Sequence, residues 1–452
     1  MSDQTQTTWA TGEVTPAAGA LDPSGPEVTE GSAPETAAPA PETAAPVASP
    51  ATPSDGSPPS GGGSNGAPPE PEALPRLAID IAETEAIEEQ FNAWLRLLVA
   101  LEGSDLHIKV GSAPLLRIDG RLQRLDRESL DAGDTGGIVD AILPEDLSAP
   151  FAERGEADFA HSLAGVGRFR VNVFRQRGTA SMVLRRLRFG GPKFEEVGLP
   201  DVIRQLSEEV RGLILVTGPT GSGKTTTLAA MLDYINRTKP AHIVTIEDPI
   251  EILHRDEVAS INQREVGQDT ESFLTALRAA LRQDPDVILI GEMRDTETVR
   301  AALQAAETGH LVLSTLHTVD ATETVNRCID FFPPYQQKQI RLTLAGTLRG
   351  IVCQRLVPTV DGGRVPSLEV LVNTGRVAER IADADKTSEI HDVIADGAYY
   401  GMRTFDQSLL QFVQAGVVSI EEAMEAASSP HDFQLALQQA GVSVPAGLHI
   451  GV

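Results

Sequence analysis

A glycine-rich segment near the middle of the chain carries the clearest chemical signal in the sequence. Residues 218–225 read Gly-Pro-Thr-Gly-Ser-Gly-Lys-Thr, which matches the pattern G-x-x-x-x-G-K-[ST]. The segment follows an aliphatic run typical of a strand and precedes a helical pattern, which is the context that a phosphate-binding P-loop requires. Its glycines let successive backbone N–H groups surround a phosphate, and the following helix adds the partial positive charge of its N-terminus.

The P-loop side chains extend this prediction to a nucleoside triphosphate. Lys224 can reach the β- and γ-phosphates, and the Thr225 hydroxyl can bind Mg²⁺. The alternative is a glycine-rich turn with an exposed lysine. The predicted nucleotide-binding residues are Gly218, Pro219, Thr220, Gly221, Ser222, Gly223, Lys224, Thr225 and Thr226.

Carboxylates at the ends of two predicted strands are candidates to orient magnesium or water. Ligands bind at the carboxyl ends of parallel strands. Glu292 comes just after the aliphatic run 287–290, and Glu247 directly follows the run 243–246, so both are expected at that edge. Asp286 stands at the other end of the run 287–290 and, at about 3.3 Å per residue, lies more than roughly 10 Å from the phosphate-binding edge. One acid can assist the metal while the other polarises water; the alternative for each is an ordinary solvated strand end.

Two histidines flank the predicted strand 311–315. His317 follows the strand, at the same edge as the P-loop, whereas His310 precedes it. By position, His317 is the better candidate to donate a hydrogen bond to the γ-phosphate. A lone histidine is more often structural, and this alternative stays open for both.

Residues 168–174 alternate between polar and apolar side chains, as in a half-buried strand. The apolar residues are expected to face inward, whereas Arg168 and Arg170 face outward. These arginines either pair with the protein's own carboxylates or meet phosphate across a subunit boundary, as arginine fingers do.

Composition divides the 452 residues into four parts. Residues 1–75 hold fifteen of the 30 prolines and no Lys or Arg, which predicts a disordered tail. Residues 76–190 combine an amphipathic helical pattern at 85–101 with short strands, which predicts an α+β domain. Residues 191–374 alternate aliphatic runs with helical segments, which predicts an α/β domain with a parallel sheet covered on both faces. Residues 375–452 read as mostly helical and end in a short tail.

Charge and cysteine content argue against several classes of protein. There are 37 Lys and Arg against 64 Asp and Glu, for a formal charge of -27. Nucleic-acid binders and polybasic membrane anchors need the opposite balance. Cys328 and Cys353 cannot make a four-thiolate zinc site. The sequence shows neither a signal peptide nor a long apolar span, so we expect a cytoplasmic protein that meets the membrane only through partners.

Four segments resemble the Walker A, Asp, Walker B and His boxes of the secretion and type IV pilus traffic ATPases. They are GPTGSGKTTT from Gly218, TIEDPIE from Thr245, DPDVILIGEMRD from Asp284 and TGHLVLSTLHT from Thr308. The resemblance covers roughly residues 85–420. It implies a PAS-like N-terminal domain, a RecA-like ATPase domain and a homohexamer with ATP between subunits. It also implies that Glu292 and Glu247 share the metal and catalytic duties, with Thr225 at the metal.

The same resemblance assigns four further residues. His310 and His317 would form the His box. Arg170 and Arg185, from the N-terminal domain of a neighbouring subunit, would complete the site. Which of the two glutamates is the general base is left open.

Within this family the chain most resembles the retraction subgroup, which drives twitching motility. It lacks the four-cysteine zinc module that pilus-assembly and type II secretion members generally carry. It departs from the retraction pattern at 375–382, where an AIRNLIR-like motif is replaced by GRVAERIA. The expected function is ATP hydrolysis coupled to type IV pilus retraction, on an inner-membrane platform protein at the pilus base.

The sequence can be compared with three alternative functions. An assembly or secretion ATPase belongs to the same class. A low-activity accessory subunit would need a degraded site, and every box here is intact. A DNA-translocating motor is disfavoured by the acidic charge.

Overall fold

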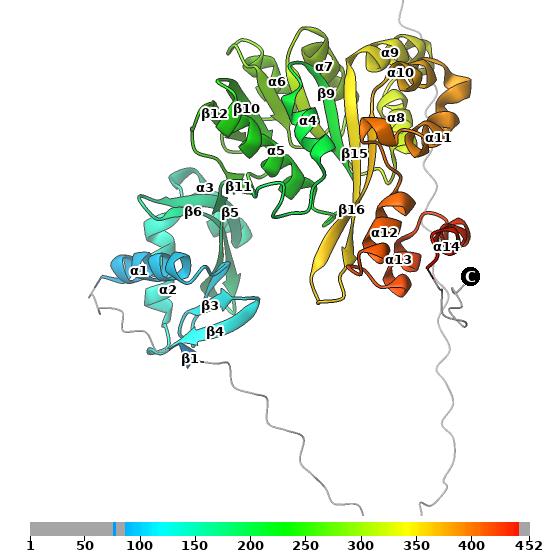
Figure 1. Cartoon of the computed structure of the whole chain (residues 1–452). Coiled ribbons are helices and arrows are strands. Elements are labelled where there is room, and N and C mark those ends of the chain that lie inside the picture. The colour runs from blue at the N-terminus through cyan, green and yellow to red at the C-terminus, as the bar shows by residue number, and fades with distance from the viewer. Residues whose placement is uncertain (1–75, 78–85, 443–452) are drawn as a thin grey trace, which may run out of the picture. The chain divides into compact units, whose positions relative to one another are not determined.

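The computed structural model describes residues 76–77 and 86–442 (Figure 1). The tail predicted for residues 1–75 and the last ten residues lie outside this range.

The N-terminal domain is built on a seven-stranded sheet in the order β1-β4-β3-β2-β7-β6-β5, antiparallel except for the β1–β4 pair. Helix α1 covers residues predicted to be helical, and its Phe91 and Trp94 pack with Ile138 of α2 and Phe169 of β6, all fully buried. The expected inward face of β6 is thereby confirmed. The elements are β1 (Arg76–Leu77), α1 (Ile87–Ala100), β2 (Asp105–Ile108), β3 (Leu115–Ile118), β4 (Arg121–Leu125), α2 (Ala132–Ile142), α3 (Glu145–Arg154), β5 (Glu156–Leu163), β6 (Gly167–Gln176) and β7 (Thr179–Arg186).

The segment that leaves this domain pairs with the P-loop domain. Strand β8 (Arg188–Phe189) lies parallel to β11 (Ile252–Leu253), and the Gly190 N–H donates to the Leu253 carbonyl at 2.7 Å.

The P-loop domain is built on a second seven-stranded sheet in the order β12-β10-β13-β14-β9-β15-β16, parallel except for β16. All four aliphatic runs predicted as strands lie in it, side by side. Its strands are β9 (Gly212–Thr217), β10 (His242–Glu247), β12 (Ser260–Glu265), β13 (Val287–Ile290), β14 (Leu311–Leu316), β15 (Leu348–Pro358) and β16 (Arg364–Val372).

Helices cover both faces of this sheet, and the P-loop strand shows why it is apolar throughout. Leu213 and Leu215 of β9 belong to the core under α6 to α9, whereas Ile214 and Val216 belong to the core under α4 and α5. A strand buried on both faces needs apolar residues at successive positions. The helices are α4 (Asp201–Glu208), α5 (Lys224–Thr238), α6 (Phe273–Ala280), α7 (Thr296–Glu307), α8 (Ala321–Asp330) and α9 (Pro334–Thr347).

The chain beyond β16 is helical, as predicted. Part of it closes the core under α8 and α9, and part forms a separate apolar cluster with Val357 of β15. These helices are α10 (Gly375–Ala382), α11 (Ile390–Ala395), α12 (Phe405–Gln414), α13 (Ile420–Ala426) and α14 (Pro430–Gln439). Among the described helices, none combines the length and apolar character needed to cross a membrane.

Candidate functional site

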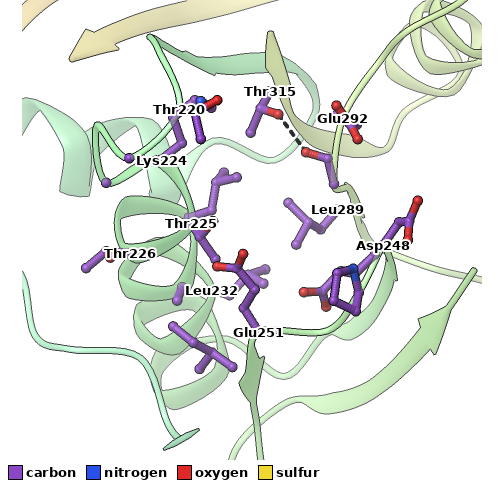
Figure 2. A pocket seen from close by; sticks show the side chains of 18 of the residues that line it. Thr220, Lys224, Thr225, Thr226, Leu232, Asp248, Glu251, Leu289, Glu292 and Thr315 are labelled. Atoms are coloured by element: carbon purple, nitrogen blue, oxygen red, sulfur yellow. Dashed lines mark hydrogen bonds between the residues drawn. The ribbon is translucent and has the colours of Figure 1, made fainter. Parts of the chain in front are cut away.

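A pocket of about 710 Å³ opens beside the P-loop, at the carboxyl ends of β10, β13 and β14. Figure 2 shows the first turn of α5, with Lys224 and Thr225, facing the strand ends that carry Glu292 and Thr315. The wall also includes Glu247 and His317. Residues predicted from four separate segments of the sequence therefore come together in one chain.

The P-loop lines this pocket with most of its predicted residues. The six in the wall are Thr220, Gly221, Gly223, Lys224, Thr225 and Thr226. Gly218, Pro219 and Ser222 are absent from the wall, and the Ser222 side chain is only 3% exposed. Gly218 has φ +141° and Gly223 has φ +92°, a left-handed backbone that favours glycine at both ends of the loop.

The Lys224 ammonium is folded back onto the loop. Its Nζ donates hydrogen bonds to the carbonyls of Gly218 at 2.8 Å and Pro219 at 3.0 Å. Burial lowers the pKa of Lys224, and the charges of Glu292 and Glu251 act in the opposite direction. A phosphate entering the pocket can replace these two neutral carbonyls with a charged acceptor, which makes a stronger hydrogen bond.

Glu292 lies in the loop between β13 and α7, and its carboxylate is held by two basic side chains. Its Oε1 forms an ion pair with Arg294, and its Oε2 lies 3.5 Å from Nε2 of His317. The start of this loop is fixed to strand β14, because the Thr315 hydroxyl donates to the Gly291 carbonyl at 2.7 Å, the bond drawn in Figure 2. His317 therefore faces Glu292 across the end of the sheet.

Glu247 is the last residue of β10 and is buried, with 9% of its surface exposed. Its Oε1 accepts hydrogen bonds from the Thr245 hydroxyl at 2.6 Å and from Gln263 Nε2 at 3.1 Å. Burial raises the pKa of Glu247, although these two donors act against the rise. Both donors use the same oxygen, so Oε2 is the atom that can act on a ligand.

The structure separates the two histidines. His310 lies before β14, at the opposite end of the strand from His317, and is not in the pocket wall. Its Nδ1 lies 2.9 Å from the Ala305 carbonyl at the end of α7. Within one chain, His310 therefore contacts the backbone of α7 and does not reach the pocket wall. Asp286 likewise lies at that far edge, where its carboxylate accepts from the His242 N–H at 2.8 Å.

Arg170 and Arg185 lie directly opposite each other on β6 and β7, on the polar face of the N-terminal sheet. Arg185 pairs with Asp105 at 2.8 Å, and Asp105 also lies 3.5 Å from Arg117. Among the described residues Arg170 has no ion pair within 4 Å, although its charge acts against the rise that burial causes in the pKa of Glu265, and it does not line the pocket of its own chain. Like charges directly opposite on neighbouring strands are destabilising, and Asp105 offsets part of this for Arg185.

Sequence reasoning missed three residues that shape the acidic side of the pocket. Arg294, the partner of Glu292, stands within the Walker B-like segment, and Thr245 opens the Asp box-like segment. Gln263 also binds the Ile252 carbonyl and accepts from the His254 N–H. The sequence offers no signal for Gln263, because its contacts depend on how β10, β11 and β12 pack.

Comparison with known proteins places the chain in a family. A family model described as "Type II/IV secretion system protein" matches residues 167–425, more than half of the chain. The chain belongs to this family. The type IV pilus retraction ATPase PilT of Pseudomonas aeruginosa is 44% identical over 330 residues, which are 73% of this chain and 96% of PilT. The type IV pilus ATPase PilU of the same organism is 42% identical over 350 residues, 77% of this chain and 91% of PilU.

A solved structure agrees with the sequence relatives. The crystal structure of the pilus retraction motor PilT with bound ADP has a TM-score of 0.70 and 43% identity, and covers 78% of this chain and 100% of that chain. These findings confirm the prediction of an ATPase with an N-terminal domain ahead of the P-loop domain. The roles of individual side chains stay predictions.

Proposed function

We propose that this protein is a homohexameric motor that hydrolyses ATP to retract type IV pili. The observation that carries the proposal is the assembled pocket, in which Lys224, Glu247, Glu292 and His317 meet beside an intact P-loop. The similarity to PilT over nearly the whole length of PilT supports a role in the type IV pilus and retraction as the direction of force.

Nucleotide binding follows from the P-loop geometry. The backbone N–H groups and Lys224 would hold the β- and γ-phosphates, with Lys224 leaving the carbonyls of Gly218 and Pro219 as it does so. Thr225 and Glu292 would hold Mg²⁺, since a hydroxyl, one carboxylate and phosphate oxygens are the ligands that this ion prefers. When bound, Mg²⁺ would neutralise charge on the phosphate oxygens.

The two carboxylates have different environments, which suggests different duties. Glu292 sits among Arg294, His317 and Lys224, so it is suited to a site of high charge. Glu247 is buried with a raised pKa and one free oxygen, so it is suited to accept a proton from the attacking water. His317 would donate a hydrogen bond to the γ-phosphate.

Completion of the site requires a second subunit. Arg170 and Arg185 face away from the protein core, on the N-terminal domain, and neither lines the pocket of its own chain. In a closed ring each subunit presents the same surface to the next. The two arginines would then enter the neighbouring pocket and stabilise charge that develops on the γ-phosphate.

The proposed place of action is the cytoplasmic base of the pilus. There the ring would work on an inner-membrane platform protein, and any contact with the membrane would pass through such partners. The segment that replaces the AIRNLIR-like motif forms α10. This helix packs against α9, and none of its residues lines the nucleotide pocket. ATP hydrolysis can therefore persist with an altered coupling segment.

A second candidate function is a partner ATPase of a principal retraction motor. The similarity to the type IV pilus ATPase PilU, at 42% identity, is close to the similarity to PilT and favours a second kind of type IV pilus ATPase over a secretion ATPase.

Deletion of the gene separates these proposals. Retraction predicts many surface pili that do not shorten, whereas an assembly motor predicts none. A partner ATPase predicts pili that still shorten, but with reduced force.

A further inference from the structure

Gln354 lies in the middle of β15, beside the P-loop strand, and is 132 residues from Ser222 of the P-loop in sequence. It is buried, with 1% of its surface exposed. A buried amide is costly unless its donors and acceptor find partners. Its partners therefore show what this residue does.

Both ends of the Gln354 amide bind the P-loop segment. Nε2 donates to the Ser222 carbonyl at 2.6 Å, and Oε1 accepts from the Thr227 hydroxyl in the first turns of α5 at 2.9 Å. The Ser222 carbonyl can only accept a hydrogen bond, so it must face the NH₂ group of the amide. Oε1 is thereby turned towards the Thr227 hydroxyl, which donates to it.

The loop is also pressed closely against this residue. A methyl group added at Gly218 would lie 2.4 Å from the Gln354 carbonyl oxygen, and one added at Gly223 would lie 3.0 Å from Gln354 Nε2. The main chain of Gln354 therefore lies under the start of the loop, and its side chain lies under the end.

The bond to Ser222 has a consequence for the phosphate side of the loop. In a trans peptide the C=O and N–H groups point in opposite directions. Because Gln354 holds the Ser222 carbonyl on the protein side, the N–H of the next residue, Gly223, is aimed the other way. Gly223 is one of the residues in the pocket wall.

We propose that Gln354 is a positioning residue for the nucleotide, which holds the Ser222–Gly223 peptide so that the Gly223 N–H faces the bound phosphate. The inference deepens the proposed function and rests on it. Gln354 touches no substrate and acts only through the loop. Without it the peptide is free to rotate, and binding must then order it.

Gln354→Met is the direct test, since methionine has a similar length and removes both hydrogen bonds. The measurement is the Kd of a fluorescent ADP analogue with Mg²⁺, together with KM and kcat for ATP. We expect Kd and KM to rise about tenfold, as for loss of one hydrogen bond on a buried group, with a smaller change in kcat. The midpoint of thermal unfolding without nucleotide serves as the stability readout.

Gln407→Met is the matched control. Gln407 also makes one accepted and one donated hydrogen bond, with the Thr404 N–H and the Ala395 carbonyl, but it lies in α12, away from the pocket. It should alter the thermal midpoint without changing the Kd. Equal nucleotide affinity in Gln354→Met and the wild type would overturn the proposal and leave Gln354 a structural residue.

A second pair of variants keeps the test decisive if Gln354→Met does not fold. Thr227→Val removes the hydroxyl that donates to Oε1 of Gln354, whereas Thr227→Ser keeps it. The valine variant should bind ADP several-fold more weakly than the serine variant, and equal affinity in the two would overturn the proposal. A wild-type chain that binds no nucleotide would contradict the proposed function itself, and the inference with it.

Discussion

Replacement of Arg170 by alanine should separate catalysis from stability. Arg170 faces Arg185 across β6 and β7 and has no ion pair within 4 Å among the described residues, so its charge contributes to the fold only through a longer-range attraction to Glu265. Directly opposed side chains have Cβ atoms about 5 Å apart, and even two bare positive charges at that spacing would repel by only about 0.8 kcal/mol in water. The guanidinium groups lie beyond the Cβ atoms, and Asp105 neutralises part of the Arg185 charge. Arg170→Ala should therefore leave the stability nearly unchanged.

ATP hydrolysis, in contrast to stability, should fall strongly in this variant. Arginine fingers contribute about 10³–10⁵ in kcat, or roughly 4–7 kcal/mol of transition-state stabilisation. We expect Arg170→Ala to lose most ATP turnover while ADP affinity weakens only modestly. The assays are steady-state phosphate release, ADP binding and thermal unfolding on the same preparation. Full turnover by this variant would refute any catalytic role and leave Arg170 as a solvated surface arginine.

Mixing tests whether the arginine acts on the neighbouring subunit. Arg170→Ala and Lys224→Ala should each be inactive alone. In rings of the two mixed equally at random, about a quarter of the sites combine an intact arginine from one subunit with an intact P-loop from the next. Partial activity should return. Its absence, with mixed rings shown to form, would mean that the arginine acts within its own chain or that all sites fire together.

Three further predictions concern the pocket itself. Lys224→Ala should abolish hydrolysis because the phosphates lose their cation, and near-normal turnover of the purified variant would contradict the ATPase assignment. Glu292→Gln should retain ATP binding but slow turnover by roughly 10²-fold or more, measured by single-turnover kinetics. If Asp286→Asn slowed turnover and Glu292→Gln did not, the strand-end argument would be contradicted. Glu247→Gln should slow turnover and also stabilise the fold at neutral pH, because burial raises the pKa of Glu247. The stability that this carboxyl contributes is present below its unfolded-state pKa and is lost as pH rises through the raised folded-state pKa. The difference in thermal midpoint between Glu247→Gln and the wild type should therefore grow from acid to neutral pH. A difference that stays constant with pH would count against the raised pKa.

Local patterns in the sequence were sufficient for the central strands and the P-loop. Strand β9 is buried on both faces, so its four aliphatic residues are contiguous, and the P-loop follows at once. The strand-end argument also held, because parallel strands must place their carboxyl ends together. It correctly placed Glu292 and His317 at the pocket, and Asp286 at the far edge.

Contacts that depend on register or on distant segments were beyond such reasoning. The opposition of Arg170 and Arg185 is set by how β6 pairs with β7. Glu247 lies at the expected edge, but its hydrogen bonds with Thr245 and Gln263 depend on how β10 and β12 pack. Gln354 lies on a strand that did not figure in the sequence analysis, and its role depends on β15 lying beside β9.

The most direct test of the central claim is the length of labelled pili, followed in living cells that carry Lys224→Ala in place of the wild-type gene. The account predicts pili that extend and then fail to shorten, with shortening restored by the wild-type gene. Pili that shorten at the wild-type rate, or cells that make no pili at all, would contradict it.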